Sequence, residues 1–308
     1  MKKSEILFLY ETSYNIPNGD PFTGEQRYDE ETKKILVSDV RIKRFVRTYL
    51  EDIEGEHIYV SENTGAGKTD SKGVLTWIAQ KWNTNQKTDI AEIMKELIDV
   101  RLFGGISTLD KNMKVGKQEF VNGHVQFTGP VQFAALNPSL NRVNLRMHQN
   151  TSHFTSKDDK AQGVISTTTL VPYSVVQIHG WINPTVAKNT DLKEDDLQKM
   201  FKALWYGTGG EGSSFSRSKV GQNSLLLLVI DYKQDFDKVY GVDRTIKLEP
   251  NEEGMKDEQI RSMEDYTLDF SKLKDLAKND KIEKIRFYTE IDKIKNELNG
   301  EKFEEMSL

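Results

Sequence analysis

The sequence contains no cysteine in its 308 residues, and it has only seven prolines and five histidines. The lack of cysteine excludes disulfide bonds, thiolate catalysis and zinc sites with cysteine ligands, and it fits a reducing compartment. Long hydrophobic runs are absent as well: the longest, at residues 225–230, is far too short to cross a membrane. Glu5 and Glu11 interrupt the N-terminal apolar stretch, so no signal peptide is expected. We therefore expect a cytoplasmic protein without membrane contact.

Hydrophobic residues make up only 36% of the chain, and the mean hydropathy is −0.62. This length suits one large domain with insertions, or two domains. The net charge of −5 is unevenly distributed. Residues 231–308 hold 21 acidic and 15 basic side chains. Residues 38–50 hold one acidic and four basic side chains, and residues 111–190 hold three acidic and eight basic ones. A basic surface outside the C-terminal quarter is therefore compatible with an acidic total that alone would argue against nucleic-acid binding.

Hydrophobic periodicity predicts the main strands and helices. Alternation places Ile6, Phe8 and Tyr10 on one face of a strand at 4–13. Helical spacing predicts an amphipathic helix at 38–52, with Ser38 as its N-cap. Further strands are predicted at 57–61, 124–136 (bent at Gly129-Pro130), 167–183, 223–232 and 283–291, and further helices at 88–105 and 190–207.

The order strand, helix, strand, strand, helix, strand remains when the irregular stretches are set aside. This order matches the RNA-recognition-motif, or ferredoxin-like, α+β fold. We expect one such domain over residues 1–308, with long excursions from it. The expected excursions are insertions at about 53–117, 137–165 and 207–222, and a C-terminal extension at 233–308.

The stretch YNIPNGDPFTGEQR at residues 14–27 interrupts the chain directly after the first strand. Asn18-Gly19 would suit a tight hairpin turn, but Pro17 and Pro21 bracket it and neither flank pairs with an obvious second strand. A loop is therefore expected up to Ser38, longer than ordinary connections, which indicates a functional segment. A solvated surface loop is the alternative.

The stretch ENTGAGKT at 62–69 invites a comparison with phosphate-binding loops of nucleotidases. That pattern requires glycine at the position of Glu62, whose carboxylate would face the bound anion. A flexible basic loop that contacts nucleic-acid phosphates through Lys68 is therefore favoured, and nucleotide binding stays an alternative. No cofactor is expected.

The sequence offers weak candidates for a metal site. His148 and His153 are five residues apart, whereas helical metal pairs prefer three or four. Asp20, Asp29 and Asp39 lie near the first loop and could hold a metal ion for RNA cleavage. Turn residues and a helix N-terminal acid are the simpler interpretation, so no metal site and no catalytic residue are expected.

Two groups of basic residues favour phosphate binding. Lys43, Arg44 and Arg47 lie outside the apolar face of helix 38–52. Arg217 and Lys219 lie among serines and glycines in the loop that precedes the buried strand 223–232, where an exposed backbone lets a polyanion approach. The strands that precede and follow these elements are neighbours in the expected fold, so both groups can face one groove.

At these residues the sequence resembles a known family. The blocks IPNGDP, QRYDEETKKILVSDVRIKRFVRTYL, TGPVQFAALNPSLNRV and FSRSKVGQ occur in order between about residues 4 and 232. They resemble the Cas-seven family, the backbone subunit of the type I CRISPR Cascade complex, and within it the type I-B (Csh-two) subgroup. Ile16 stands where the family usually has asparagine, whereas Asn18, Gly19 and Asp20 match.

The resemblance implies a non-catalytic subunit that stacks in several copies along a CRISPR RNA for antiviral defence. It implies a palm with a fingers-type insertion at about 53–117 and web- or thumb-type insertions at 137–165 and 207–222, the latter favoured as the thumb. The implied partners are CRISPR RNA, the target DNA strand paired to it, further copies of the chain, and the large, small and 5′-handle-binding subunits of Cascade. Related type III subunits cleave target RNA with an aspartate in the first loop, so a metal-dependent ribonuclease using Asp20 or Asp29 is the alternative.

The residues expected to bind RNA come from four regions, namely the first loop, the basic helix, the candidate phosphate loop and the insertions. They are Asn18, Gly19, Arg27, Ser38, Arg41, Lys43, Arg44, Arg47, Lys68, Gln132, Arg142, Arg217, Ser218 and Lys219.

Overall fold

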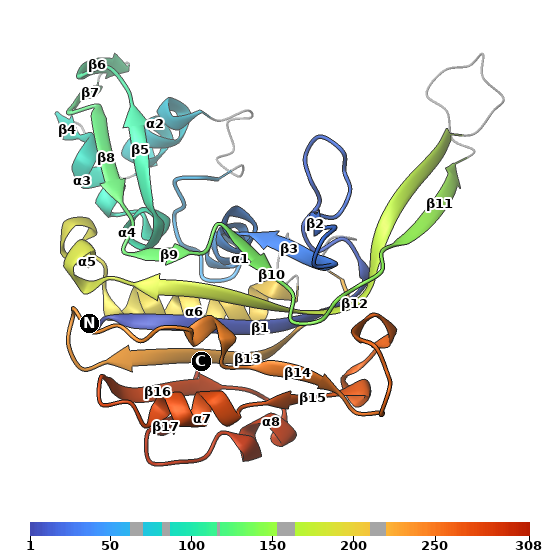
Figure 1. Ribbon diagram of the computed structural model, residues 1–308. Coiled ribbons are helices and arrows are strands. Elements are labelled where there is room, and N and C mark those ends of the chain that lie inside the picture. Colours follow the sequence, from blue (N-terminus) through green and yellow to red (C-terminus); the bar gives the residue numbers. More distant parts are fainter. Residues whose placement is uncertain (62–69, 82–86, 116–117, 153–163, 210–219) are drawn as a thin grey trace.

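A central antiparallel sheet organises the computed structural model, which describes residues 1–61, 70–81, 87–115, 118–152, 164–209 and 220–308 (Figure 1). Its core strands follow the order β9–β12–β1–β13. Their bounds are Val131–Phe133 for β9, Val164–Ile182 for β12, Ser4–Asn15 for β1 and Gln222–Tyr232 for β13. Every neighbouring pair is antiparallel. Strand β1 lies between β12 and β13, as the predicted fold requires.

Two helices cover one face of this sheet. Helix α1 (Asp39–Asp52) follows β1, and α6 (Glu194–Thr208) follows β12 and precedes β13. Both pack on Ile6, Phe8 and Tyr10 in one hydrophobic core. The helices approach closely, because a Cβ at Gly207 would lie 2.9 Å from the carbonyl oxygen of Phe45. The mixed helix and sheet fold, with the order β-α-β-β-α-β, is thereby confirmed.

The C-terminal quarter covers the opposite face of the sheet. Leu7 and Leu9 of β1 point into a second core that residues 242–298 complete. Strand β16 joins the sheet beside β13, and β17 pairs with β16 in parallel. The elements of this layer are η2 (Val242–Arg244), β14 (Lys247–Pro250), η3 (Asp257–Gln259), η4 (Met263–Asp265), β15 (Tyr266–Asp269), α7 (Ser271–Ala277), β16 (Ile282–Tyr288), α8 (Asp292–Glu297) and β17 (Phe303–Glu305).

A long insertion between α1 and β9 has a core of its own, which includes Leu75, Ile90 and Phe120. Its elements are α2 (Ser71–Lys81), β4 (Thr88–Asp89), α3 (Ile90–Lys95), α4 (Ile98–Phe103), β5 (Gly104–Thr108), β6 (Asn112–Val115), β7 (Gln118–Val121) and β8 (His124–Thr128). It occupies the upper left of Figure 1.

Two sequence predictions in this insertion are wrong. Residues 57–61 are not a strand, because the amides of Tyr59 and Val60 donate to the Asp99 carboxylate at 2.7 and 3.2 Å rather than to a neighbouring strand. The predicted helix 88–105 is two short helices, α3 and α4, separated at Glu96-Leu97. Its predicted end is correct, since Gly104 has a φ of +78° and begins β5.

An arm projects from the sheet where β11 (Arg146–Ser152) pairs with the first half of β12 (Figure 1). The sequence analysis assigned no strand to this part of 137–165. Met147 is the one apolar residue in β11, so no alternation of apolar residues marks the strand.

The first loop is shorter than predicted. After residues 16–27 the chain forms β2 (Tyr28–Asp29) and β3 (Lys34–Ser38), and β3 pairs with β10 (Leu136–Pro138). Ile35 and Val37 of β3 are buried.

The predicted helix 190–207 corresponds to α6, which begins later, at Glu194. A separate helix, α5 (Pro184–Thr190), precedes it, and Asn183 is the N-cap of α5. Within the described ranges, no helix is long and apolar enough to span a membrane.

A buried ion pair joins the insertion to the helices of the sheet. The Arg101 guanidinium of α4 donates two hydrogen bonds, at 2.8 and 2.7 Å, to the Asp196 carboxylate of α6, and both side chains are buried. We expect Asp196→Ala to lower the free energy of unfolding by about 3–5 kcal/mol, because it leaves a buried guanidinium without its partner. The neighbouring Asp195→Ala should cost less than about 1 kcal/mol, since Asp195 is exposed and its ion pair with Lys199 lies at the surface. Urea denaturation of both variants tests this, and equal losses would contradict it.

Candidate nucleic-acid interface

The loop at residues 16–27 is fastened at its base by two buried amide side chains. The Oδ1 of Asn18 accepts from the Ser38 amide at 2.7 Å, which ties the loop to the start of α1. The amide of Asn18 donates to Gln26 Oε1 at 2.8 Å, and the Gln26 Nε2 donates to the carbonyl of Leu36 at 3.1 Å. Asn18 thus acts on the protein backbone and holds the loop against β3.

The tip of this loop is organised by Asp20. Its carboxylate accepts from the amides of Phe22 and Thr23 at 2.9 and 3.3 Å and pairs with Arg27 at 3.1 Å. The Phe22 amide, followed by Thr23 and Arg27, holds the pKa of Asp20 below its usual value. Gly19 forms an isolated bridge with Gln26. The tip is therefore a turn held by hydrogen bonds and an ion pair among its own residues.

The base of the loop that precedes β13 lies beside the first loop. Asn15 Nδ2 donates to the carbonyl of Val220 at 2.8 Å, and the Ser13 amide donates to the carbonyl of Gly221 at 2.9 Å. Gly221 has a φ of +83°, and a Cβ there would lie 2.9 Å from the Ser13 carbonyl oxygen, so glycine is required. Strand β1 pairs with β13, as predicted, so the end of β1 and the start of β13 lie at the same edge of the sheet. Arg217, Ser218 and Lys219, like Lys68, lie outside the described residues.

The basic residues of α1 have different surroundings. Lys43 pairs with Asp39 at 3.1 Å and donates to Gln132 Oε1 of β9 at 3.4 Å, which brings together two residues expected to bind RNA. Arg44 is exposed. Lys43 and Gln132 therefore lie together where α1 meets β9, and the Lys43 side chain is 12% exposed.

The guanidinium groups of Arg41 and Arg47 make contacts inside the protein. Arg47 Nε donates to the buried Asp99 at 2.9 Å and lies over the Phe103 ring, so it links α1 to the insertion. Arg41 lies 4.7 Å over the Phe45 ring, and burial lowers its pKa.

Ser38 and Arg142 complete the predicted set. Ser38 is the N-cap of α1 by position, but its hydroxyl makes no capping hydrogen bond and is buried without a hydrogen-bond partner among the described residues. The Arg142 amide donates to Asp257 of η3 at 3.1 Å, and the guanidinium lies 3.8 Å from the same carboxylate. Arg142 therefore lies against the C-terminal layer.

The aspartates considered for a metal ion have separate partners. Asp29 accepts from the Thr32 hydroxyl at 2.6 Å and the Glu31 amide at 3.1 Å, and the bond to Thr32 is the first cause that lowers its pKa. Asp39 pairs with Lys43. No group of three metal-ligating side chains occurs in the part of the chain that the structure describes. His148 lies on the exposed arm, and His153 is outside the described residues.

Sequence reasoning missed two features of the site. Gln26 is buried and fastens the first loop. No local sequence pattern predicts this role. Phe22 is 96% exposed at the loop tip. The signal for Phe22 was available, since it is the one large apolar residue between Pro21 and Arg27 in a run of turn-forming residues.

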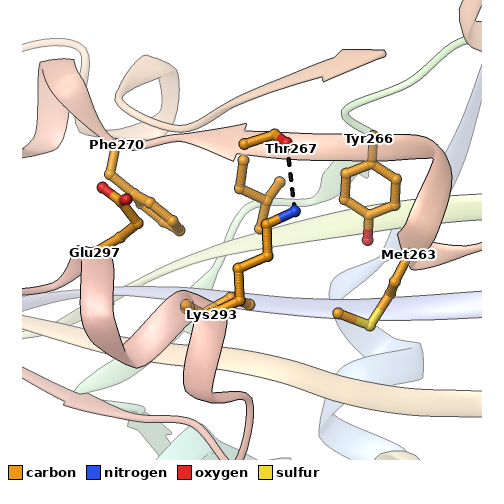
Figure 2. Close-up of a pocket in the computed structure, with 8 residues that line it drawn as sticks. Met263, Tyr266, Thr267, Phe270, Lys293 and Glu297 are labelled. Carbon is orange, nitrogen blue, oxygen red and sulfur yellow. Dashed lines mark hydrogen bonds between the residues drawn. The ribbon is translucent and has the colours of Figure 1, made fainter. Parts of the chain in front are cut away.

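A pocket in the C-terminal layer lies outside this interface (Figure 2). It lies between β15 and α8, and its volume of about 60 Å³ is far below that of typical ligand sites. Lys293 at its rim donates to the Thr267 hydroxyl at 3.4 Å. The residues that line it are Met263, Tyr266, Thr267, Leu268, Phe270, Lys293, Ile294 and Glu297.

Comparison with known proteins identifies the family. A CRISPR-associated protein Cas7 from Haloferax volcanii is 26% identical over 286 residues, which cover 89% of this chain and 82% of that protein. A chain of a structure described as a CRISPR RNA-guided surveillance complex, pre-nicking, matches with a TM-score of 0.56 and 12% identity, over 99% of this chain and 96% of that chain. A second CRISPR RNA-guided surveillance complex matches with a TM-score of 0.52 and 12% identity, over 94% and 90%. The family model for CRISPR-associated protein Cas7 matches residues 2–271, and the chain therefore belongs to the Cas7 family.

Proposed function

We propose that this protein is a non-catalytic backbone subunit that binds CRISPR RNA in several copies within a type I surveillance complex in the cytoplasm. Family membership over residues 2–271 is the observation that carries the proposal. The similar folds come from RNA-guided surveillance complexes, in which further copies and the other Cascade subunits would be its partners. In such complexes base pairing reads the sequence, and the protein holds the nucleic-acid backbone.

The interface described above suits a role in holding a backbone. Lys43 and Gln132 lie together where α1 meets β9. The end of β1, where the loop at 16–27 starts, and Val220 before β13 lie at one edge of the sheet. The insertion that begins at residue 53 would form the fingers. Residues 137–165, whose strand β11 pairs with β12 in a projecting arm, and residues 207–222 are the two candidates for the thumb (Figure 1).

The proposal leaves Asp20 and Asp29 without a catalytic role, because both carboxylates accept hydrogen bonds within their own turns. We expect the assembled complex to leave complementary RNA intact in magnesium, and Asp20→Ala and Asp29→Ala to change nothing in that assay. Gel analysis of labelled RNA measures the outcome. Magnesium-dependent cleavage abolished by either substitution would favour the ribonuclease alternative. The nucleotidase alternative concerns residues 62–69, outside the described residues, and a nucleotide-binding assay decides it.

We expect the protein to purify with RNA and to form oligomers whose size increases with concentration. An acidic C-terminal layer and a basic central region favour head-to-tail contacts, which build open helical assemblies. Light scattering coupled to size-exclusion chromatography, with absorbance ratios for nucleic acid, checks both. A monomer free of RNA at high concentration and low salt would contradict the proposal.

Replacing Lys43 and Lys219 together with alanine should weaken RNA binding whatever the guide sequence. Each phosphate contact to a single strand contributes about 0.7 to the slope of log affinity against log salt, so the slope should fall by a little over one unit (roughly 1.4). The matched control replaces Lys247 and Lys278, two exposed lysines of the C-terminal layer, and should leave the slope unchanged. Titration at several salt concentrations tests this. An unchanged slope in the first variant would move the RNA path elsewhere, with residues 137–165 as the next candidate.

A further inference from the structure

We propose that Phe22 stacks on an unpaired nucleobase of the bound strand, and that Asp20 positions it for this contact. The inference rests on the proposed function, because it requires that RNA passes the first loop. Its basis is an exposed aromatic ring on a tightly bonded turn, at the sheet edge where two loops of the interface meet.

The exposure of Phe22 is unusual for its residue type. The side chain is 96% exposed, more than any other large hydrophobic side chain in the described part of the chain. Phenylalanine is normally among the most buried residues. Single exposed apolar side chains are common on protein surfaces, so the exposure of Phe22 counts here together with its fixed turn and its place beside the candidate interface. An aromatic ring also provides large contact area at little cost in conformational entropy, because it has only two rotatable bonds.

The backbone beneath Phe22 is fixed. Besides the bonds to Asp20, the Gly24 amide donates to the Asp20 carbonyl at 2.8 Å and the Asp20 amide donates to the Glu25 carbonyl at 2.7 Å. Gly24 has a φ of +72°, which closes the turn. The ring is therefore presented by a preformed scaffold, and binding does not have to order the loop.

The location connects this ring to the proposed RNA path. Asn18 ties the loop to the start of α1, and Asn15 ties the preceding residues to the base of the loop before β13. In Figure 1 the blue loop beside β2 rises above the sheet, away from the C-terminal layer. A strand that contacts α1 and both loops would pass this tip.

Charge does not prevent a polyanion from approaching the tip. The Asp20 carboxylate is compensated by Arg27 at 3.1 Å and by two backbone amides. This leaves Glu25 as the other carboxylate between residues 20 and 27.

The neighbours of Phe22 favour a base over a protein pocket as its occupant. Residues that dominate protein interfaces are surrounded by further contacts that exclude water. Here the ring is 96% exposed as a flat apolar group, and no other large apolar residue lies between Pro21 and Arg27 in the sequence. Such a face suits a nucleobase, and stacking tolerates any base, as a subunit that holds variable guide sequences requires.

Five substitutions in the full-length chain, stripped of co-purified RNA, test the proposal, and Asp20→Asn is one of them. Phe22→Trp keeps a ring for stacking, Phe22→Leu keeps apolar volume without a ring, and Phe22→Ala removes both. Phe236→Leu is the control, since Phe236 is 80% exposed in the C-terminal part of the chain. Affinity is measured for single-stranded RNA, and 2-aminopurine, whose fluorescence falls on stacking, is placed either in the guide or in its complementary strand.

We expect Phe22→Ala and Phe22→Leu to weaken RNA binding by about 5- to 150-fold, the equivalent of about 1–3 kcal/mol per stacked base. Phe22→Trp should bind as the unmodified protein does, and Phe236→Leu should change nothing. The quenching of 2-aminopurine fluorescence should disappear in Phe22→Ala and Phe22→Leu, which lack the ring. The strand in which the label is quenched, guide or complementary strand, identifies the source of the stacked base. Asp20→Asn should reduce quenching without abolishing binding, because it loosens the turn and leaves the ring in place.

Two results would overturn the inference and leave the proposed function intact. One is equal RNA affinity and quenching in Phe22→Leu and the unmodified protein. The other is a loss of self-association in Phe22→Ala with unchanged RNA affinity, which would assign the ring to a protein contact. If the unmodified protein itself fails to bind RNA, the proposed function fails and the inference fails with it.

Discussion

The burial of strand β1 on both faces is the constraint on which the rest of the molecule depends. Ile6, Phe8 and Tyr10 need the helices α1 and α6, and Leu7 and Leu9 need the C-terminal layer. Because β1 also pairs on both edges, with β12 and β13, the segments that leave its end and enter β13 must lie together. The candidate interface is thus a consequence of how the core is closed, because hydrogen bonds from the buried strand β1 hold Val220 and Gly221 beside the start of the first loop.

Buried charges then attach the insertion to this core. Arg47 of α1 meets Asp99, and Arg101 of α4 meets Asp196 of α6, so each ion pair crosses between the insertion and a helix on the sheet. Asp99 also accepts from the amides of Tyr59 and Val60. Such pairs contribute geometry more than net stability, because desolvation offsets much of the Coulomb energy. They fix the insertion relative to α1, which carries Lys43 at the interface.

The sequence could predict those parts of the fold in which burial on one side produces a regular spacing of apolar residues. β1, α1, β12, α6 and β13 were found because apolar residues recur along them. The arm strand β11 was missed because it has a single apolar residue, Met147. The break between α3 and α4 was missed because the helical pattern runs through it. The contacts of the candidate site residues could be predicted only in part. Arg47 looked like a surface residue because its partner, Asp99, is 52 positions away in the sequence, and contacts of that range leave no local signal.

Pairing also changes how the positive charge of this region should be understood. Asp20 meets Arg27, Asp39 meets Lys43 and Asp99 meets Arg47, so carboxylates accompany several of the basic residues that the sequence offers for RNA. A chain with a net charge of −5 then cannot hold a polyanion by bulk attraction alone. In the proposed function, affinity would then come from contacts placed by geometry: a few phosphate contacts, backbone groups of the first loop, and an aromatic ring that needs no charge. A subunit that repeats along one strand gains from this arrangement, because modest contacts in each copy add up along the strand while neighbouring copies do not repel one another through a large uniform charge.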